Sequence, residues 1–290
     1  AFTDGCTVGE AAFAGTSFDK LIIQNTDSTL NNTNTNTIGN GTAVFGTATY
    51  SFTAVPEEAD RSFGAAAFKK LTVIGTGNRI GDNAFTGVTI SGLEDVCIDV
   101  QGNDTSIGES AFSGVTLTGA INVSGENVSI GEIAFSDATL TGAINVSGEN
   151  VSIGESAFSG AMLTGVPITV TGENVTIGES AFSGATLTDV PITVTGDDVT
   201  IDANAFRGTT FASLTISGAR ASVADGAFYG TTISGDVEIS GENVTMDVGT
   251  AGSGVFGGMN MYGSRSINFK YRKIPAALTS NALLCPYCIS

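Results

Sequence analysis

The sequence contains no tryptophan and no histidine, and only five of its 290 residues are proline. Without histidine, the chain lacks the side chain that most often serves as a general base and as a metal ligand near neutral pH. Carboxylates are plentiful, but they recur in repeats and form no singular motif, and no glycine-rich phosphate loop leads into a helix. The sequence therefore does not predict an enzyme.

Basic residues are scarce as well: 11 Lys and Arg stand against 29 Asp and Glu, for a formal net charge of −18 at pH 7. Phosphate backbones are bound by clustered basic side chains, so nucleic acid is not predicted as a partner. No window reaches the ~18 apolar residues that span a bilayer, so membrane insertion is not predicted either. The acidic surface favours solubility and association with cations.

Cysteine occurs at four widely separated positions: Cys6, Cys97, Cys285 and Cys288. The last two form a Cys-Pro-Tyr-Cys motif with the spacing of a redox dithiol. That chemistry needs a helix after the first cysteine to lower the thiol pKa, and only two residues follow the motif. We expect no oxidoreductase activity and interpret all four cysteines as candidates for disulfides, within this chain or to another, compatible with an oxidising compartment.

The most informative feature of the sequence is a repeat. GENVSIGEIAF, GENVSIGESAF, GENVTIGESAF and GDDVTIDANAF follow one another between residues 125 and 206. Their closing phenylalanines are 23, 24 and 24 residues apart: Phe135, Phe158, Phe182 and Phe206. A fixed period in this range indicates a solenoid, in which stacked units share one elongated core. We predict that these phenylalanines form one buried column, flanked by Ile130, Ile153, Ile177 and Ile201.

Short fragments within each unit alternate apolar and polar residues, as in Ile144-x-Val146 and Val151-x-Ile153, and this is the period of a β-strand. Residues 155–159 fit one helical or 3₁₀ turn. The repeats are irregular over residues 1–100 and regular over 101–258, and the polar stretch at 25–37 is interpreted as a surface loop. We predict an all-β solenoid over residues 1–258, a β-coil rod, and a distinct cap or docking tail over 259–290.

The unit IGESAFSGAMLTGVPITVTGENVTIG, at residues 153–178, resembles the BspA-like leucine-rich repeat family. Its Ile153-Gly154, Ala157-Phe158 and Leu163, followed by alternating Ile and Val, are similar to that family's repeat of about 23 residues. The resemblance covers most of residues 75–250. It implies a surface or extracellular protein that mediates adhesion or protein contacts, and it implies no catalytic residue. Departures from the family pattern, such as the position of Pro167, suggest a more regular coil than a horseshoe.

Nine Asn-x-Ser/Thr sequons are candidate N-glycosylation sites if the protein is secreted by a eukaryote: Asn31, Asn40, Asn103, Asn122, Asn127, Asn145, Asn150, Asn174 and Asn243. A repeat rich in Ser, Thr and Asn also produces such triplets automatically. Asn127, Asn150 and Asn174 are expected to stack at strand spacing, too close for each to carry a glycan easily, and an asparagine ladder at a turn is the alternative. Glycosylation is expected mainly at Asn31 and Asn40.

Glutamates recur at the same spacing in two sets: Glu126, Glu149 and Glu173, and Glu109, Glu132, Glu155 and Glu179. Like charges at strand spacing repel one another, so these rows are expected to face water or to bind cations. Calcium is a weak option because it prefers oxygen ligands, but no defined calcium loop is present. No cofactor is predicted.

Threonines flank a leucine in successive units: Thr116, Thr118, Thr139, Thr141, Thr164, Thr186 and Thr188. With the leucine inward, the threonines face outward, and a flat, regular threonine grid is typical of ice-binding solenoids. Met162 interrupts this grid, and threonine is also simply favoured in strands.

The sequence thus predicts a non-enzymatic, extracellular or cell-surface structural or adhesive repeat protein, with ice binding as the alternative. Its expected partners are proteins, with glycans as a further option. A basic tail on an acidic rod favours end-to-end self-association through residues 259–290, which would form a filament or sheath.

Overall fold

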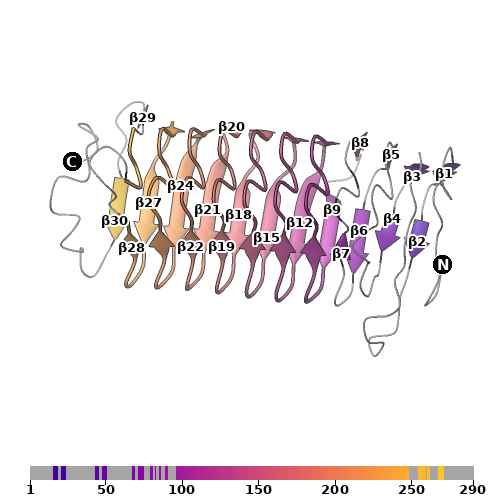
Figure 1. The fold of residues 1–290 in the computed structure, drawn as a ribbon, viewed down its shortest axis with the longest axis horizontal. Helices are drawn as coiled ribbons and strands as arrows, with labels where there is room; N and C mark the ends of the chain where they lie inside the picture. Colours follow the sequence, from indigo (N-terminus) through magenta and orange to yellow (C-terminus); the bar gives the residue numbers. More distant parts are fainter. Residues whose placement is uncertain are drawn as a thin grey trace.

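The computed structural model describes residues 98–247 and 254–258 together with their side chains. It also describes the side chains at positions 80, 82 and 85, and the backbone of short strands between residues 16 and 97 and between 260 and 270. Every regular element in this part of the chain is a β-strand. Figure 1 shows the chain wound into coils that stack along one axis as a rod. The prediction of an all-β solenoid is confirmed.

Three parallel sheets run along the rod, and each coil contributes one strand to each sheet over the regular part. Sheet 1 comprises β1 (Thr16–Phe18), β3 (Ala43–Phe45), β5 (Ala67–Phe68), β8 (Thr89–Ile90), β11 (Thr116–Leu117), β14 (Thr139–Leu140), β17 (Met162–Thr164), β20 (Thr186–Thr188), β23 (Thr210–Phe211), β26 (Thr232–Ile233) and β29 (Asn260–Met261).

Sheet 2 has the longest strands. It comprises β2 (Leu21–Ile23), β4 (Ala48–Tyr50), β6 (Leu71–Ile74), β9 (Val96–Gln101), β12 (Ala120–Ser124), β15 (Ile144–Ser147), β18 (Ile168–Thr171), β21 (Pro191–Thr195), β24 (Ser213–Ser217), β27 (Val237–Ser240) and β30 (Ile267–Lys270). Sheet 3 comprises β7 (Arg79–Ile80), β10 (Ser106–Ile107), β13 (Ser129–Ile130), β16 (Ser152–Ile153), β19 (Thr176–Ile177), β22 (Thr200–Ile201), β25 (Ser222–Val223) and β28 (Thr245–Met246).

Equivalent positions of successive repeats pair directly across the sheets. Ile144 lies beside Ile168 in sheet 2, and Ile153 lies beside Ile177 in sheet 3. Because strand side chains alternate between two faces, every coil turns the same positions inward. The alternation in β15 is one example: Ile144 and Val146 are buried, whereas Asn145 and Ser147 are half-buried on the outer face.

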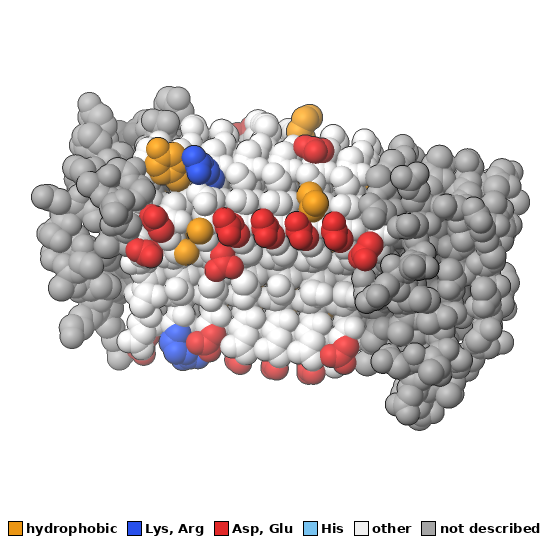
Figure 2. All heavy atoms as spheres, viewed as in Figure 1, with side chains coloured by type: hydrophobic (Ala, Val, Ile, Leu, Met, Phe, Trp, Pro, Cys, Tyr) orange, Lys and Arg blue, Asp and Glu red, His pale blue; other side chains and the backbone are white. Residues whose placement is uncertain are grey.

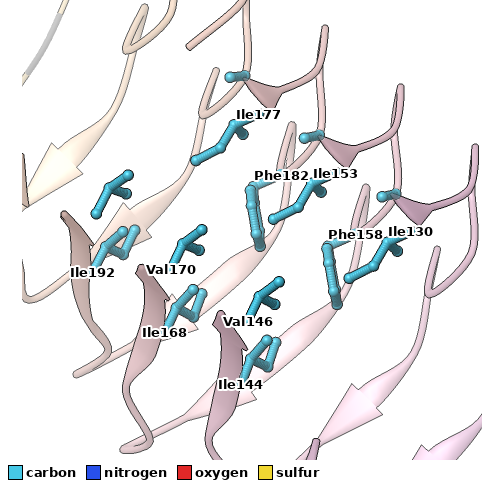
Figure 3. Close-up of a cluster of buried hydrophobic side chains, with 14 of the residues drawn as sticks. Ile130, Ile144, Val146, Ile153, Phe158, Ile168, Val170, Ile177, Phe182 and Ile192 are labelled. Atoms are coloured by element: carbon cyan, nitrogen blue, oxygen red, sulfur yellow. The ribbon is translucent and has the colours of Figure 1, made fainter. Parts of the chain in front are cut away.

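The phenylalanines form the predicted buried column. Ring centroids of successive members lie 4.8 to 5.1 Å apart and their planes differ by only 2 to 5°, over the set Phe85, Phe112, Phe135, Phe158, Phe182, Phe206 and Phe228. Ile130, Ile153 and Ile177 lie beside Phe158 and Phe182 in the core (Figure 3). Since each ring contacts the next, the column continues the same apolar core from coil to coil.

The segment that carries each phenylalanine is a series of tight turns. The backbone N–H groups of Ala157, Ser159 and Ala161 donate to carbonyls three residues earlier, at 3.0 to 3.3 Å. Ser156 (φ 53°) and Gly160 (φ 69°) have left-handed backbones, which a right-handed helix does not accommodate. The expected single helical or 3₁₀ turn at 155–159 is therefore replaced by separate turns.

Glycine is required where the chain turns from sheet 2 towards sheet 3. Gly148 has a φ of 143° and its α-carbon faces the preceding coil so closely that an added Cβ would lie 1.7 Å from the carbonyl oxygen of Gly125. No residue with a side chain fits there, so this repeated glycine sets how closely the coils stack.

The boundary predicted at residue 258 remains a prediction, although β29 and β30 extend sheets 1 and 2 past it by pairing with β26 and β27. The polar loop at 25–37 lies outside the described residues. So do Cys6, Cys285 and Cys288, and for Cys97 only its backbone position in β9 is described. The candidate disulfides therefore remain predictions.

Candidate contact faces

Acidic side chains gather on one side of the rod, around sheet 3. Both glutamate rows are exposed to solvent in the structure, as predicted. Glu126, Glu149 and Glu173 lie in the turns before the strands of sheet 3, and Glu109, Glu132, Glu155 and Glu179 lie in the turns after them. Figure 2 shows acidic side chains in rows along the axis on this side. The serines and threonines of sheet 3 lie between the two rows.

These rows do not converge on a common point. Among the residues whose side chains the structure describes, no group of three or more acidic or cysteine side chains is placed to hold a metal ion. The same part of the chain contains no helix long and apolar enough to cross a bilayer.

An asparagine ladder runs along the turn before sheet 3. The Nδ2 of Asn174 donates to Oδ1 of Asn150 (3.1 Å), Asn150 donates to Asn127 (2.9 Å), and Asn127 donates to Oδ1 of Asp104 (2.8 Å). All four residues have φ near 53°, in the left-handed region that Asn and Asp tolerate best. The ladder interpretation of these three sequons is confirmed.

The asparagine ladder ends at Asn174, and different residues occupy the same position in the next coils. The next coil has Asp198 in this position, which has no amide to donate, and the following coil has Arg220. The guanidinium of Arg220 contacts both carboxylate oxygens of Asp198 at 2.6 Å, and its Nη2 lies 3.6 Å from Asp197. The hydrogen bond from Arg220 lowers the pKa of Asp198, and the same hydrogen bond raises the pKa of Arg220.

The other sequons fall into different surroundings. Asn145 donates to Oδ1 of Asn122 (2.8 Å) on the outer face of sheet 2, and the amide of Asn103 donates to Glu126 (3.2 Å). Asn243 is exposed. Asn31 and Asn40, where glycans were mainly expected, lie outside the described residues. Glycosylation at any of the nine positions stays a prediction.

The threonine array predicted from the sequence lies on the outer face of sheet 1. Leu117, Leu140, Leu163 and Leu187 are buried, so their threonine neighbours face outward as expected. Parallel pairing aligns Thr116 with Thr139, but Thr139 and Thr186 both pair with Met162. The Met162 side chain is 54% exposed, so it interrupts the array as the sequence indicated.

A second hydroxyl-bearing face, which the sequence reasoning missed, lies on sheet 2. Over β12, β15, β18, β21 and β24 its outward positions form two aligned ranks. The first rank is Asn122, Asn145, Thr169, Thr193 and Thr215, and the second is Ser124, Ser147, Thr171, Thr195 and Ser217. The signal is present in the sequence as Thr-Val-Thr at 169–171 and 193–195, one repeat apart, but alternation alone does not show which outward positions share a face.

The outward strand positions of sheets 1 and 2 are free of charge over most of the described rod, although Asp137 and Asp189 are exposed in turns that border these sheets. No outward residue of β12, β15, β18, β21 or β24 is ionisable, and the nearest charges in the ranks are Asp99 on β9 and Glu238 on β27. The outward positions of β11, β14, β17, β20, β23 and β26 are likewise uncharged. The rod therefore has one acidic side and two uncharged, largely hydroxyl-bearing faces.

Comparison with known proteins gives a family. No curated protein and no solved structure matches the chain. A family model described as "BspA type Leucine rich repeat region" matches residues 57–188 and 152–270, in six copies. Proteins with these repeats are typically surface proteins, and the family is usually non-catalytic. Because the matched segments span most of the sequence and its repeats form the three-sheet coils, the chain belongs to the BspA type leucine-rich repeat family.

Proposed function

We propose that this protein is a non-enzymatic rod, extracellular or on the cell surface, that makes structural or adhesive contacts through the uncharged faces of sheets 1 and 2. The acidic side around sheet 3 remains hydrated and keeps the rods soluble. Adhesion and assembly into a filament or sheath are the two forms that this role takes.

The observation that carries the proposal is the separation of charge between the sides of the rod. A chain with a net charge of −18 repels other acidic macromolecules at long range. Bringing a carboxylate into a contact also costs desolvation free energy unless a partner compensates for it. Faces of small uncharged side chains avoid that cost, and their hydroxyl groups can donate and accept hydrogen bonds. The desolvation free energy of a contact is therefore lowest on sheets 1 and 2.

End-to-end assembly through residues 259–290 is the second part of the proposal. This segment contains Lys270, Arg272 and Lys273, whereas the rod is acidic, so the tail of one chain is complementary in charge to the body of the next. A head-to-tail contact of this kind is heterologous and continues into a filament unless its rotation closes a ring. Cysteines Cys285 and Cys288 lie in the same segment and would lock such a joint in an oxidising compartment.

The adhesive role is tested with beads that carry the purified chain and are applied to a cell layer. Thr139→Glu places a carboxylate on sheet 1 and Thr193→Glu places one on sheet 2, and both should reduce bead retention. Ser152→Glu is the matched control, because Ser152 is exposed on sheet 3, where glutamates already lie on either side. Retention that is absent for the unmodified chain, or equally reduced by all three variants, would refute the assignment of these faces.

Assembly and location are tested separately. Light scattering of the full chain under oxidising conditions should show particles larger than those of a chain that lacks residues 259–290. A full chain that stays monomeric at high concentration would exclude assembly. Antibody labelling of intact, unpermeabilised cells and of the surrounding medium should detect the protein, and a signal found only after permeabilisation would contradict the surface or extracellular location.

A further inference from the structure

The outer face of sheet 2 is a two-dimensional grid of small polar side chains. Its two ranks occupy alternate positions of five consecutive strands, from β12 to β24, and the pairing stays in register between each strand and the next. Eight of the ten side chains carry a hydroxyl group, and the other two are Asn122 and Asn145. All ten are half-buried, because each is flanked by its neighbours in the ranks, so the grid is even and no long side chain projects from it.

The backbone sets the spacing of this grid. Along the rod, successive rings of the phenylalanine column lie 4.8 to 5.1 Å apart, which gives the spacing between coils. Along a strand, residues two apart lie about 6.7 Å apart on the same face. Hydroxyl groups held in this way cannot rearrange freely. Water bound to these hydroxyl groups would therefore follow the same period along the rod.

This axial period is close to a spacing found in ice. Two water–water hydrogen bonds of about 2.75 Å that meet at the tetrahedral angle separate second-neighbour oxygens by about 4.5 Å. The mismatch is about 0.4 Å per coil. With the two lattices aligned at the central strand, β18, the offset reaches about 0.8 Å at β12 and at β24, less than a fifth of the 4.5 Å period. Five coils are therefore short enough for both lattices to stay in phase.

The chemistry of the face agrees with its spacing. Each hydroxyl donates one hydrogen bond and accepts two. A water molecule in ice donates two and accepts two, so a hydroxyl can supply three of the four hydrogen bonds of a lattice position. Threonine adds a methyl group beside the hydroxyl, which provides apolar surface between the polar points. No charged side chain lies in the grid, so no tightly hydrated ion disturbs the ordered water.

The other two faces are less suitable. On sheet 1 the exposed Met162 lies in the middle of the threonine rank, and several strands have only two residues. On sheet 3 a single hydroxyl rank lies between two rows of glutamates (Figure 2). The sequence suggested sheet 1 as the ice-binding candidate, and the structure favours sheet 2 because only there do two uninterrupted, uncharged ranks run side by side.

We propose that the outer face of sheet 2, from β12 to β24, binds ice. This activity goes beyond the adhesive and structural role. It needs no macromolecular partner, so it can succeed or fail independently of that role.

The test measures thermal hysteresis and inhibition of ice recrystallisation with the purified full chain, using serum albumin as the baseline. The full chain should separate the freezing and melting temperatures and produce faceted ice crystals. Thr193→Tyr places a bulky ring inside the grid, on β21, and should abolish most of this effect. Ser152→Tyr makes the same change on sheet 3 and should leave the effect unchanged.

Circular dichroism and thermal melts of both variants establish that the fold is intact. If Thr193→Tyr melts early, Thr193→Lys on the same position is used, since lysine extends into solvent and disrupts the grid without filling it. The proposal is overturned if the full chain behaves like albumin, or if the variants on sheets 2 and 3 lose the same fraction of activity. The bead assay on the same proteins reports on adhesion separately.

Discussion

Replacing Phe158 with alanine removes one ring from the middle of the stacked column. The side chain is fully buried, and its ring centroid lies 4.9 Å from that of Phe135 on one side and 4.9 Å from that of Phe182 on the other, with planes tilted by 2° in both cases. The substitution therefore leaves a cavity between two coils and ends the ring contacts on both sides.

The magnitude follows from this geometry. Truncation of a buried phenylalanine to alanine costs about 3–5 kcal/mol of unfolding free energy. We expect the upper part of that range, because the neighbouring rings are held by backbone pairing and have little freedom to collapse into the cavity. For a domain of 150–250 residues each kcal/mol lowers Tm by about 2–4 °C, so a loss of about 4–5 kcal/mol lowers it by roughly 8–20 °C.

The assay is thermal and urea unfolding followed by far-ultraviolet circular dichroism, since the chain has no tryptophan. Met162→Ala is the matched control: it lies four residues away, in the next strand of the same unit, and its side chain is 54% exposed. Its effect should stay within about 0.5 kcal/mol. Because the core is continuous from coil to coil, the melting curve of Phe158→Ala also shows whether the coils unfold in a single transition. Equal melting curves for the two variants would refute the column as the source of stability.

Two further predictions concern the turns. Gly148→Ala should destabilise the coil far more than Gly184→Ala, because a Cβ on Gly148 would meet the Gly125 carbonyl oxygen at 1.7 Å, whereas a Cβ on Gly184 would meet no atom within 4 Å. Gly184→Ala should cost only the roughly 1–2 kcal/mol of a side chain in the left-handed region. Similar urea midpoints for the two variants would contradict this. Arg220→Gln should lower Tm slightly at neutral pH. Since Arg220 lowers the pKa of Asp198 below its ordinary value of 3.8, this contribution is present above pH 3.8 and is lost as the pH falls through the lowered pKa. The difference in Tm between the two proteins should therefore shrink below pH 3.8, and a difference that persists unchanged there would exclude the ion pair as its cause.

Much of the fold was predictable because the repeat multiplies weak local signals. A single Ile-x-Val fragment is too short to identify a strand, but the same fragment at each repeat, with a phenylalanine at a fixed distance, permits only a stacked arrangement. The same logic predicted that Phe158 would stack on its equivalents, and it offered an asparagine ladder through Asn127 and Asn150 as the alternative to glycans, since identical residues one coil apart lie at strand spacing. In both cases a residue contacts the equivalent residue of the neighbouring coil.

Other features depend on where the chain turns, and the repeat pattern does not encode this directly. Ser156 and Gly160 have left-handed backbones, so separate turns replace the expected helical turn. The angle at each corner decides which outward residues share a face. The sequence by itself therefore determined the coil, its core and its polar ladder, since these depend only on the period. Only the tertiary structure decided that the carboxylates gather around sheet 3 and that Thr193 and Thr195 belong to an uncharged grid, because the corners separate positions that are close together in the sequence.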